Sequence, residues 1–203
     1  MAKPAEIQFI LIRTGETEWD AQGRVSGAAD IPLSEKGLLQ ASETVQALAD
    51  VPLDVVIGAE DEASVVLMTR LAEASHAKVR KVPGLGEMRL GLWEGMRQCD
   101  LEEKYPTAYR QWCEDPAGVV VPDGETIGDA EDRIIGQVIR TLEKCKATNV
   151  ALVLRPIANG IVRSWVDRKG TSSLWTSVNE GPTVDVRTLA REELRAWRER
   201  AEH

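Results

Sequence analysis

Two segments of this 203-residue chain carry side chains suited to binding an anion, and each follows a short apolar run. Residues 7–12 (IQFILI) lead directly into Arg13-Thr14-Gly15, and residues 149–154 (NVALVL) lead into Arg155. Runs of this kind are typical of parallel strands that are covered on both faces. An arginine guanidinium is a planar fork of donors that fits a phosphate, sulfate or carboxylate. Because ligands of open α/β sheets bind beyond the carboxyl ends of the strands, we expect a pocket at these two segments.

Residues that could act as nucleophiles or metal ligands are few. The chain has two histidines, His76 and His203, and three widely spaced cysteines, Cys99, Cys113 and Cys145. An odd number of cysteines at this spacing fits neither a disulfide framework nor a zinc site. We therefore predict reduced thiols, no metal and no cofactor, and we expect neither histidine to be catalytic.

Hydrophobic periodicity predicts the elements that position these residues. Strands are expected at 7–12, 53–57, 79–82, 149–154 and 183–187, and helices at 34–49, up to 74, around 101–112, at 127–146, 157–168 and 189–201. This alternation predicts a three-layer α/β/α fold with a mainly parallel central sheet. We expect a single domain over 1–203, with a cap or loop insertion at about 85–123 and a terminal helix at about 189–201.

Four segments carry a family resemblance: residues 11–20 (LIRTGETEWD), 30–37 (DIPLSEKG), 87–95 (EMRLGLWEG) and 122–126 (PDGET). Together they resemble the histidine phosphatase superfamily, in its phosphoglycerate mutase-like branch, and the similarity extends over about 7–187. The resemblance implies a phosphoglycerate mutase-like fold. It also implies a site in which an Arg-His-Gly motif presents a nucleophilic histidine, while arginines and a second histidine hold the phosphate.

The chain departs from that pattern at the residues that carry the chemistry. Thr14 stands at the position of the nucleophilic histidine, and a hydroxyl is a poor nucleophile without a neighbouring base. Alignment from the late strand puts Arg155 at the second histidine, whereas counting back from Arg163 puts Ala158 there. The family's phosphate-holding arginine falls at Ala63, next to three carboxylates at 60–62 that are typical of a helix N-terminus.

The resemblance marks eight candidate ligand-binding residues, and none of them is expected to be catalytic. They are Arg13, Thr14, Gly15, Asp20, Arg24, Gly27, Glu87 and Arg155. Glu87 stands at the position of the family's proton donor. Asp20 stands where the family usually has asparagine. Either Asp20 or Glu87 could instead form an internal salt bridge with Arg13.

These departures favour a pseudoenzyme that binds a small anionic or phosphorylated ligand, or a protein partner, and is not an enzyme. One alternative is a phosphatase or phosphoryl-transfer enzyme with a non-histidine mechanism, using Thr14 or a water activated by Glu87, Asp20 or Glu16. Another alternative is a structural or regulatory interaction protein with a closed pocket, whose partner or second copy binds a surface such as the 189–201 helix.

The formal net charge of −8 provides no cationic field for nucleic acid. No apolar stretch approaches the roughly 20 residues that span a bilayer, and the first residues lack a signal-peptide pattern. We therefore expect a cytoplasmic protein that binds neither nucleic acid nor membrane.

Overall fold

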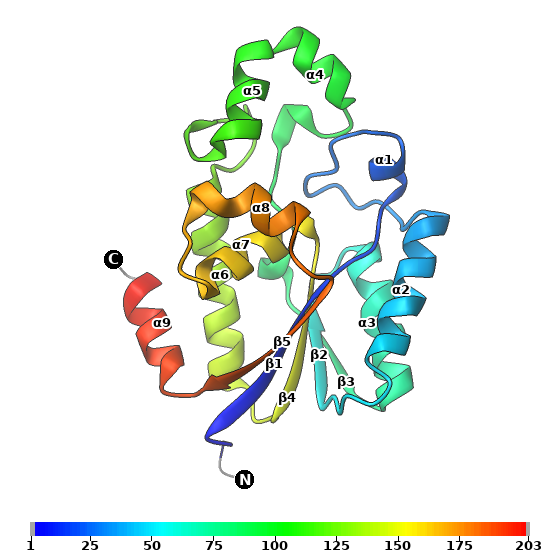
Figure 1. Ribbon diagram of the computed structural model, residues 1–203, viewed down its shortest axis with the longest axis vertical. Coiled ribbons are helices and arrows are strands. Elements are labelled where there is room, and N and C mark those ends of the chain that lie inside the picture. The colour runs from blue at the N-terminus through cyan, green and yellow to red at the C-terminus, as the bar shows by residue number, and fades with distance from the viewer. Residues whose placement is uncertain (1–2, 202–203) are drawn as a thin grey trace.

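Strands and helices alternate along residues 3–201, the part of the chain that the computed structural model describes (Figure 1). The strands are β1 (Glu6–Arg13), β2 (Val55–Gly58), β3 (Lys78–Lys81), β4 (Asn149–Leu154) and β5 (Val184–Ala190). The helices are α1 (Glu18–Ala21), α2 (Glu35–Ala47), α3 (Glu62–Ser75), α4 (Gln98–Lys104), α5 (Pro106–Glu114), α6 (Ile127–Lys144), α7 (Pro156–Val166), α8 (Leu174–Asn179) and α9 (Glu193–Ala201).

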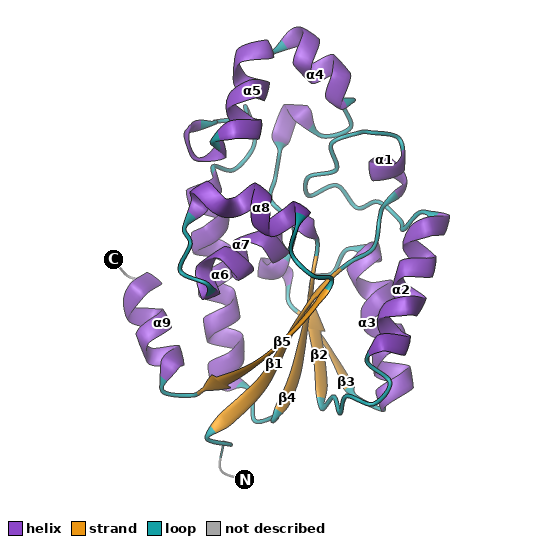
Figure 2. Cartoon of the chain, viewed as in Figure 1, coloured by secondary structure: helices purple, strands orange, loops and turns teal. Residues whose placement is uncertain are grey.

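The five strands form one sheet in the order β3-β2-β4-β1-β5 (Figure 2). β4 pairs in parallel with both β1 and β2, and β3 pairs in parallel with β2, whereas β5 runs antiparallel to β1. Arg13 pairs with Leu154 at the end of β4, so the segments that follow β1 and β4 leave the sheet at the same edge. The predicted mainly parallel sheet is confirmed.

Helices cover both faces of the sheet, and the side chains of β1, an interior strand, alternate between two cores. Phe9 and Leu11 pack in the larger core with residues of α6 and α7. Ile10 and Ile12 pack in the second core with residues of α2 and α3. Strands buried on both faces read as continuous apolar runs, which explains the pattern of residues 7–12. The predicted three-layer α/β/α fold is confirmed.

The range 85–123 contains α4 and α5, which lie beyond the carboxyl edge of the sheet (Figure 1). Three tryptophans pack together where this segment meets the rest of the fold. Trp112 meets Trp93 edge-on at 5.9 Å between ring centroids and meets Trp175 of α8 at 5.0 Å. These contacts join the segment to the main core. The division into one domain over 1–203 with a cap insertion stays a prediction.

The predicted terminal helix at 189–201 was wrong at its start. Leu189 and Ala190 belong to β5, where they pair with Ile7 and Glu6, and α9 begins at Glu193. An apolar residue at a strand end also fits the periodicity of a following helix, so the sequence pattern could not separate the two. The short helices α1 and α8 were not expected.

None of the helices within residues 3–201 combines the length and the apolar character needed to cross a membrane.

The placement of α7, which follows the candidate pocket segment at Arg155, depends on a glycine. A β-carbon on Gly160 would overlap the side chain of Val178 and lie 3.2 Å from Leu174, both on α8. Valine has little χ1 freedom with which to move aside.

We expect Gly160→Ala to lower the free energy of unfolding by about 1–3 kcal/mol through overpacking, measured by urea denaturation. Gly128→Ala on α6 is the matched control, because the nearest atom to its added β-carbon lies 3.8 Å away. That control should be neutral or stabilising by about 0.4–1 kcal/mol. Equal stability of the two variants would contradict the packing described for α7 and α8.

Candidate active site

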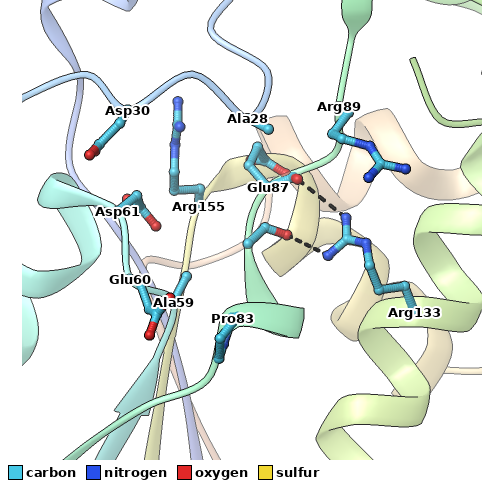
Figure 3. Close-up of a pocket in the computed structure, with 11 residues that line it drawn as sticks. Ala28, Asp30, Ala59, Glu60, Asp61, Pro83, Glu87, Arg89, Arg133 and Arg155 are labelled. Atoms are coloured by element: carbon cyan, nitrogen blue, oxygen red, sulfur yellow. Dashed lines mark hydrogen bonds between the residues drawn. The ribbon is translucent and has the colours of Figure 1, made fainter. Parts of the chain in front are cut away.

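A cavity of about 380 Å³ opens at the carboxyl edge of the sheet, lined by both acidic and basic side chains (Figure 3). The acidic residues are Asp30, Glu60, Asp61 and Glu87, and the basic residues are Arg89, Arg133 and Arg155. They come from the loop between α1 and α2, from the segments that follow β2, β3 and β4, and from α6, so segments far apart in the sequence meet here.

Glu87 is buried in the wall of this cavity and is only 5% exposed. Its Oε1 accepts hydrogen bonds from the backbone N–H groups of Met88 and Ala158, each at 2.8 Å, and its Oε2 accepts one from Ile157 at 2.8 Å. Ile157 and Ala158 are in the first turn of α7, whose unpaired N–H groups attract a carboxylate. Glu87 therefore joins the loop after β3 to the start of α7.

The pKa of Glu87 lies above its ordinary value because burial removes water from the carboxylate. The positive charge of Arg155 and the three backbone hydrogen bonds oppose this rise without cancelling it. Glu87 thus keeps its proton to a higher pH than an exposed glutamate does, as a general acid requires.

Arg155 is the first residue after β4 and the N-cap residue of α7, and it is only 3% exposed. One guanidinium nitrogen donates to the carbonyl oxygen of Ala29 at 2.8 Å, and its Nε has no partner among the described residues. Ala158, the other position considered for the second histidine, lies one helical turn further on and does not line this cavity. The replacement side chain in the cavity is therefore Arg155.

Arg133 on α6 also lines the cavity, but its donors are already used. It binds both carboxylate oxygens of Glu125, at 2.7 and 2.8 Å, and the carbonyl oxygens of Gly84, Gly86 and Glu87 at 2.9–3.2 Å. Figure 3 shows its guanidinium against the loop that carries Glu87. Burial raises the pKa of Glu125, but hydrogen bonds from Arg133 and from the Arg89 backbone outweigh it and hold the value below normal.

Arg133 was not among the predicted site residues. Glu125 lies in the PDGET segment, and Arg133 follows it by eight residues on the partly buried side of an amphipathic helix. This spacing is the only feature of the sequence that points to Arg133. That spacing does not reveal which loop the guanidinium contacts.

The acidic side of the cavity is built around the start of α3. Asp61 is the N-cap residue of α3, and its Oδ1 accepts from the Ser64 N–H at 3.0 Å, while its Oδ2 has no partner among residues 3–201. Asp30 accepts from the Glu62 N–H at 2.7 Å. Ala63, at the position of the family's arginine, is fully buried in the second core. The expected helix-terminal charge cluster is present, and two of its three carboxylates, those of Glu60 and Asp61, line the cavity.

Three of the predicted residues, Arg13, Thr14 and Gly15, line a different cavity of about 270 Å³ that Thr183 and Val184 also border. The guanidinium of Arg13 donates to the carbonyl oxygen of Val178. Thr14 is 5% exposed, and its Oγ1 has no partner within the described residues. The two segments expected to form one pocket therefore border two.

Asp20, Arg24 and Gly27 line neither cavity. Asp20 closes the capping box of α1 with Thr17 and accepts from the Ser26 hydroxyl at 2.9 Å, so its carboxylate is not paired with Arg13. Arg24 donates to the Gly95 carbonyl oxygen at 2.6 Å, and Gly27 has a φ of 51° beside Glu94. These residues shape the loop whose Ala29 carbonyl holds Arg155. That any of them binds a ligand stays a prediction.

His76 is exposed and ends α3 in the left-handed conformation, away from both cavities, and His203 lies outside the described residues. Within residues 3–201, no three or more His, Cys, Asp and Glu side chains converge in a way that could hold a metal ion.

Comparison with known proteins decides the family. A model of the histidine phosphatase superfamily (branch 1) matches residues 9–201. This chain belongs to the histidine phosphatase superfamily. The family match covers every strand from β2 onward and β1 from Phe9, so it extends over most of the fold.

Several relatives of this superfamily member are named as phosphatases. Phosphoserine phosphatase 1 of Hydrogenobacter thermophilus is 34% identical over 130 residues, which are 64% of this chain and 62% of that protein. Adenosylcobalamin/alpha-ribazole phosphatase of Salmonella typhimurium is 35% identical over 115 residues, 57% of each chain. These matches span less than two thirds of either relative. The alpha-ribazole phosphatase structure from Shigella flexneri superposes with a TM-score of 0.75 at 26% identity, covering 84% of each chain.

The prediction that this chain is not an enzyme was wrong, because relatives at 34% and 35% identity and a solved structure at 26% identity are named as phosphatases. Threonine at position 14 excludes a phosphohistidine at that residue, but it does not exclude hydrolysis by another nucleophile.

The environment of Glu87 predicts how its carboxyl group titrates. By ¹³C NMR of labelled glutamate side chains, assigned by the signal lost in Glu87→Gln, its pKa should lie above the ordinary value. Arg155→Met should raise it further, because the opposing positive charge is removed. Arg89→Met is the control, since Arg89 is not among the groups that shift this pKa. An ordinary or lowered pKa, or no response to Arg155→Met, would contradict the described environment.

Proposed function

We propose that this chain is a phosphatase that hydrolyses a phosphate monoester in the cavity of Glu87 and Arg155, by direct attack of water. The observation that carries the proposal is the pairing, in one cavity, of a buried carboxyl group of raised pKa with a buried arginine whose Nε has no hydrogen-bond partner among the described residues. Buried groups with perturbed pKa values in a cleft are characteristic of catalytic sites. The names of the relatives support the reaction class.

Arg155 binds the phosphoryl oxygens in this mechanism. Its guanidinium is fixed by the Ala29 carbonyl oxygen and keeps donors for the substrate. Arg89, whose side chain is 63% exposed at the rim, adds a second cation, although it lies 3.4 Å from Glu125. Positioned cations are effective in phosphoryl transfer because negative charge is spread over the phosphoryl oxygens in the transition state.

Glu87 donates a proton to the leaving group. As the bond between phosphorus and the ester oxygen breaks, the electron pair stays on that oxygen, which takes the proton from Glu87. The proton is available because burial raises the pKa of this carboxyl group. The backbone donors of α7 then stabilise the carboxylate that remains.

Water is the nucleophile, and Asp61 accepts its proton. The Oδ2 of Asp61 has no hydrogen-bond partner among the described residues, and Asp61 lines the same cavity as Glu87. The products are inorganic phosphate and an alcohol. Exchange with solvent then returns a proton to Glu87 and removes the one that Asp61 accepted. Thr14 borders the other cavity, and a phosphothreonine ester would be too stable for turnover.

We expect the purified protein to release phosphate from a panel of phosphate monoesters. Glu87→Gln should lower kcat by about 10²–10⁴-fold, the usual contribution of a general acid. Arg155→Ala should raise KM and lower kcat together, because Arg155 binds both the substrate and the transition state. Glu131→Gln is the matched control, since Glu131 also has a pKa raised by burial but lines a separate cavity.

Two results would contradict this proposal. The first is the absence of phosphate release from every monoester, or release that Glu87→Gln leaves unchanged. The second is a phosphoryl adduct on Thr14, detected by mass spectrometry of protein quenched during turnover, because direct attack by water forms no covalent intermediate.

A further inference from the structure

We infer that the substrate carries an ammonium group a few bonds from its phosphate, so that it enters the cavity as a zwitterion. This inference rests on the proposed phosphatase function and specifies its substrate class. It follows from how charge is divided between the two sides of the cavity.

The cavity has an acidic side and a basic side. In Figure 3, Asp30, Asp61 and Glu60 lie on one side of the Arg155 side chain, and Arg89 and Arg133 lie on the other. All five of these residues line the same cavity as Arg155. A ligand with one uniform charge would be repelled by one of the two sides, whereas a zwitterion matches both.

The acidic side is not neutralised from within the described residues. Glu60 is exposed and has no hydrogen bond or ion pair in the described part of the chain, and Asp30 uses one carboxylate oxygen for the Glu62 N–H. The charge of Arg133, in contrast, is matched by Glu125. Once a phosphate dianion occupies Arg155, no other cation of the described residues is left to balance Asp30, Glu60 and Asp61. An ammonium group on the substrate would supply that charge.

A second observation shows that the cavity is built for a ligand. Arg155 is 3% exposed, and its Nε has no partner among residues 3–201 although the side chain lines the cavity. A buried polar atom without a partner is costly, and an acceptor oxygen from a ligand relieves that cost. The phosphate thus binds at Arg155, and the ammonium group lies towards Glu60 and Asp30.

The test compares two ligands that cannot be hydrolysed, 2-aminoethylphosphonate and propylphosphonate, which differ by an ammonium group in place of a methyl group. Calorimetric titration of the full chain should give about tenfold or greater preference for the amino compound, as expected for two or three carboxylates acting together. The preference should weaken at high salt, because the carboxylates at the rim are exposed to screening.

Glu60→Gln is the informative variant, because no contact within the described residues depends on its side chain. It should reduce the preference by about two- to fivefold, the contribution of one exposed ion pair. Glu62→Gln is the matched control, since it removes a neighbouring carboxylate that does not line the cavity. That variant should leave the ratio of the two dissociation constants unchanged.

Equal affinity for the two phosphonates, or a preference that Glu60→Gln and Glu62→Gln alter alike, would overturn the inference. So would a preference for the amino compound that a chelator abolishes, which would assign the cation to a bound metal. Hydrolysis assays with 2-aminoethyl phosphate and propyl phosphate separate the two proposals. Hydrolysis of both at equal kcat/KM defeats only the zwitterion inference, whereas selective binding without hydrolysis of either defeats the phosphatase proposal.

Discussion

The contact between the Glu87 carboxyl group and the first turn of α7 is the interaction on which the rest of the site depends. It joins the loop after β3 to the loop after β4, and Arg133 holds the first of these loops through three carbonyl oxygens. The same contact fixes the start of α7, where Arg155 emerges. Because the carboxyl group is buried, the helix terminus that holds it in place also stabilises its charged form after proton transfer.

The site has exchanged cations for carboxylates where the superfamily resemblance implies phosphate-binding residues. Ala63 is buried in the core instead of presenting an arginine, and Asp61 and Glu60 face the cavity beside it. Arg155 restores one positive charge at the end of β4. The resulting division into an acidic and a basic side favours a substrate that brings its own positive charge.

The sequence predicted the fold well because its central strands are continuous apolar runs, which leave little choice of element. It predicted the site only in part. Two of the candidate residues, Glu87 and Arg155, line one cavity. Arg13 instead donates to the carbonyl oxygen of Val178 and borders another cavity, and that contact joins residues 165 positions apart. The role of Arg133 could not be predicted for the same reason, because the loop that it contacts is more than forty positions away in the sequence. The expectation of inactivity treated the loss of both histidines and one arginine as the loss of the reaction.

A crystal structure of the protein with orthovanadate, which mimics the phosphoryl group in the transition state of its transfer, tests the central claim most directly. The account predicts vanadium in the cavity of Glu87 and Arg155, with an oxygen on the Arg155 guanidinium and another facing the Glu87 carboxyl group. Vanadate bound at Arg13 and Thr14, with Thr14 Oγ1 as an axial ligand, would contradict it and would assign the chemistry to the other cavity.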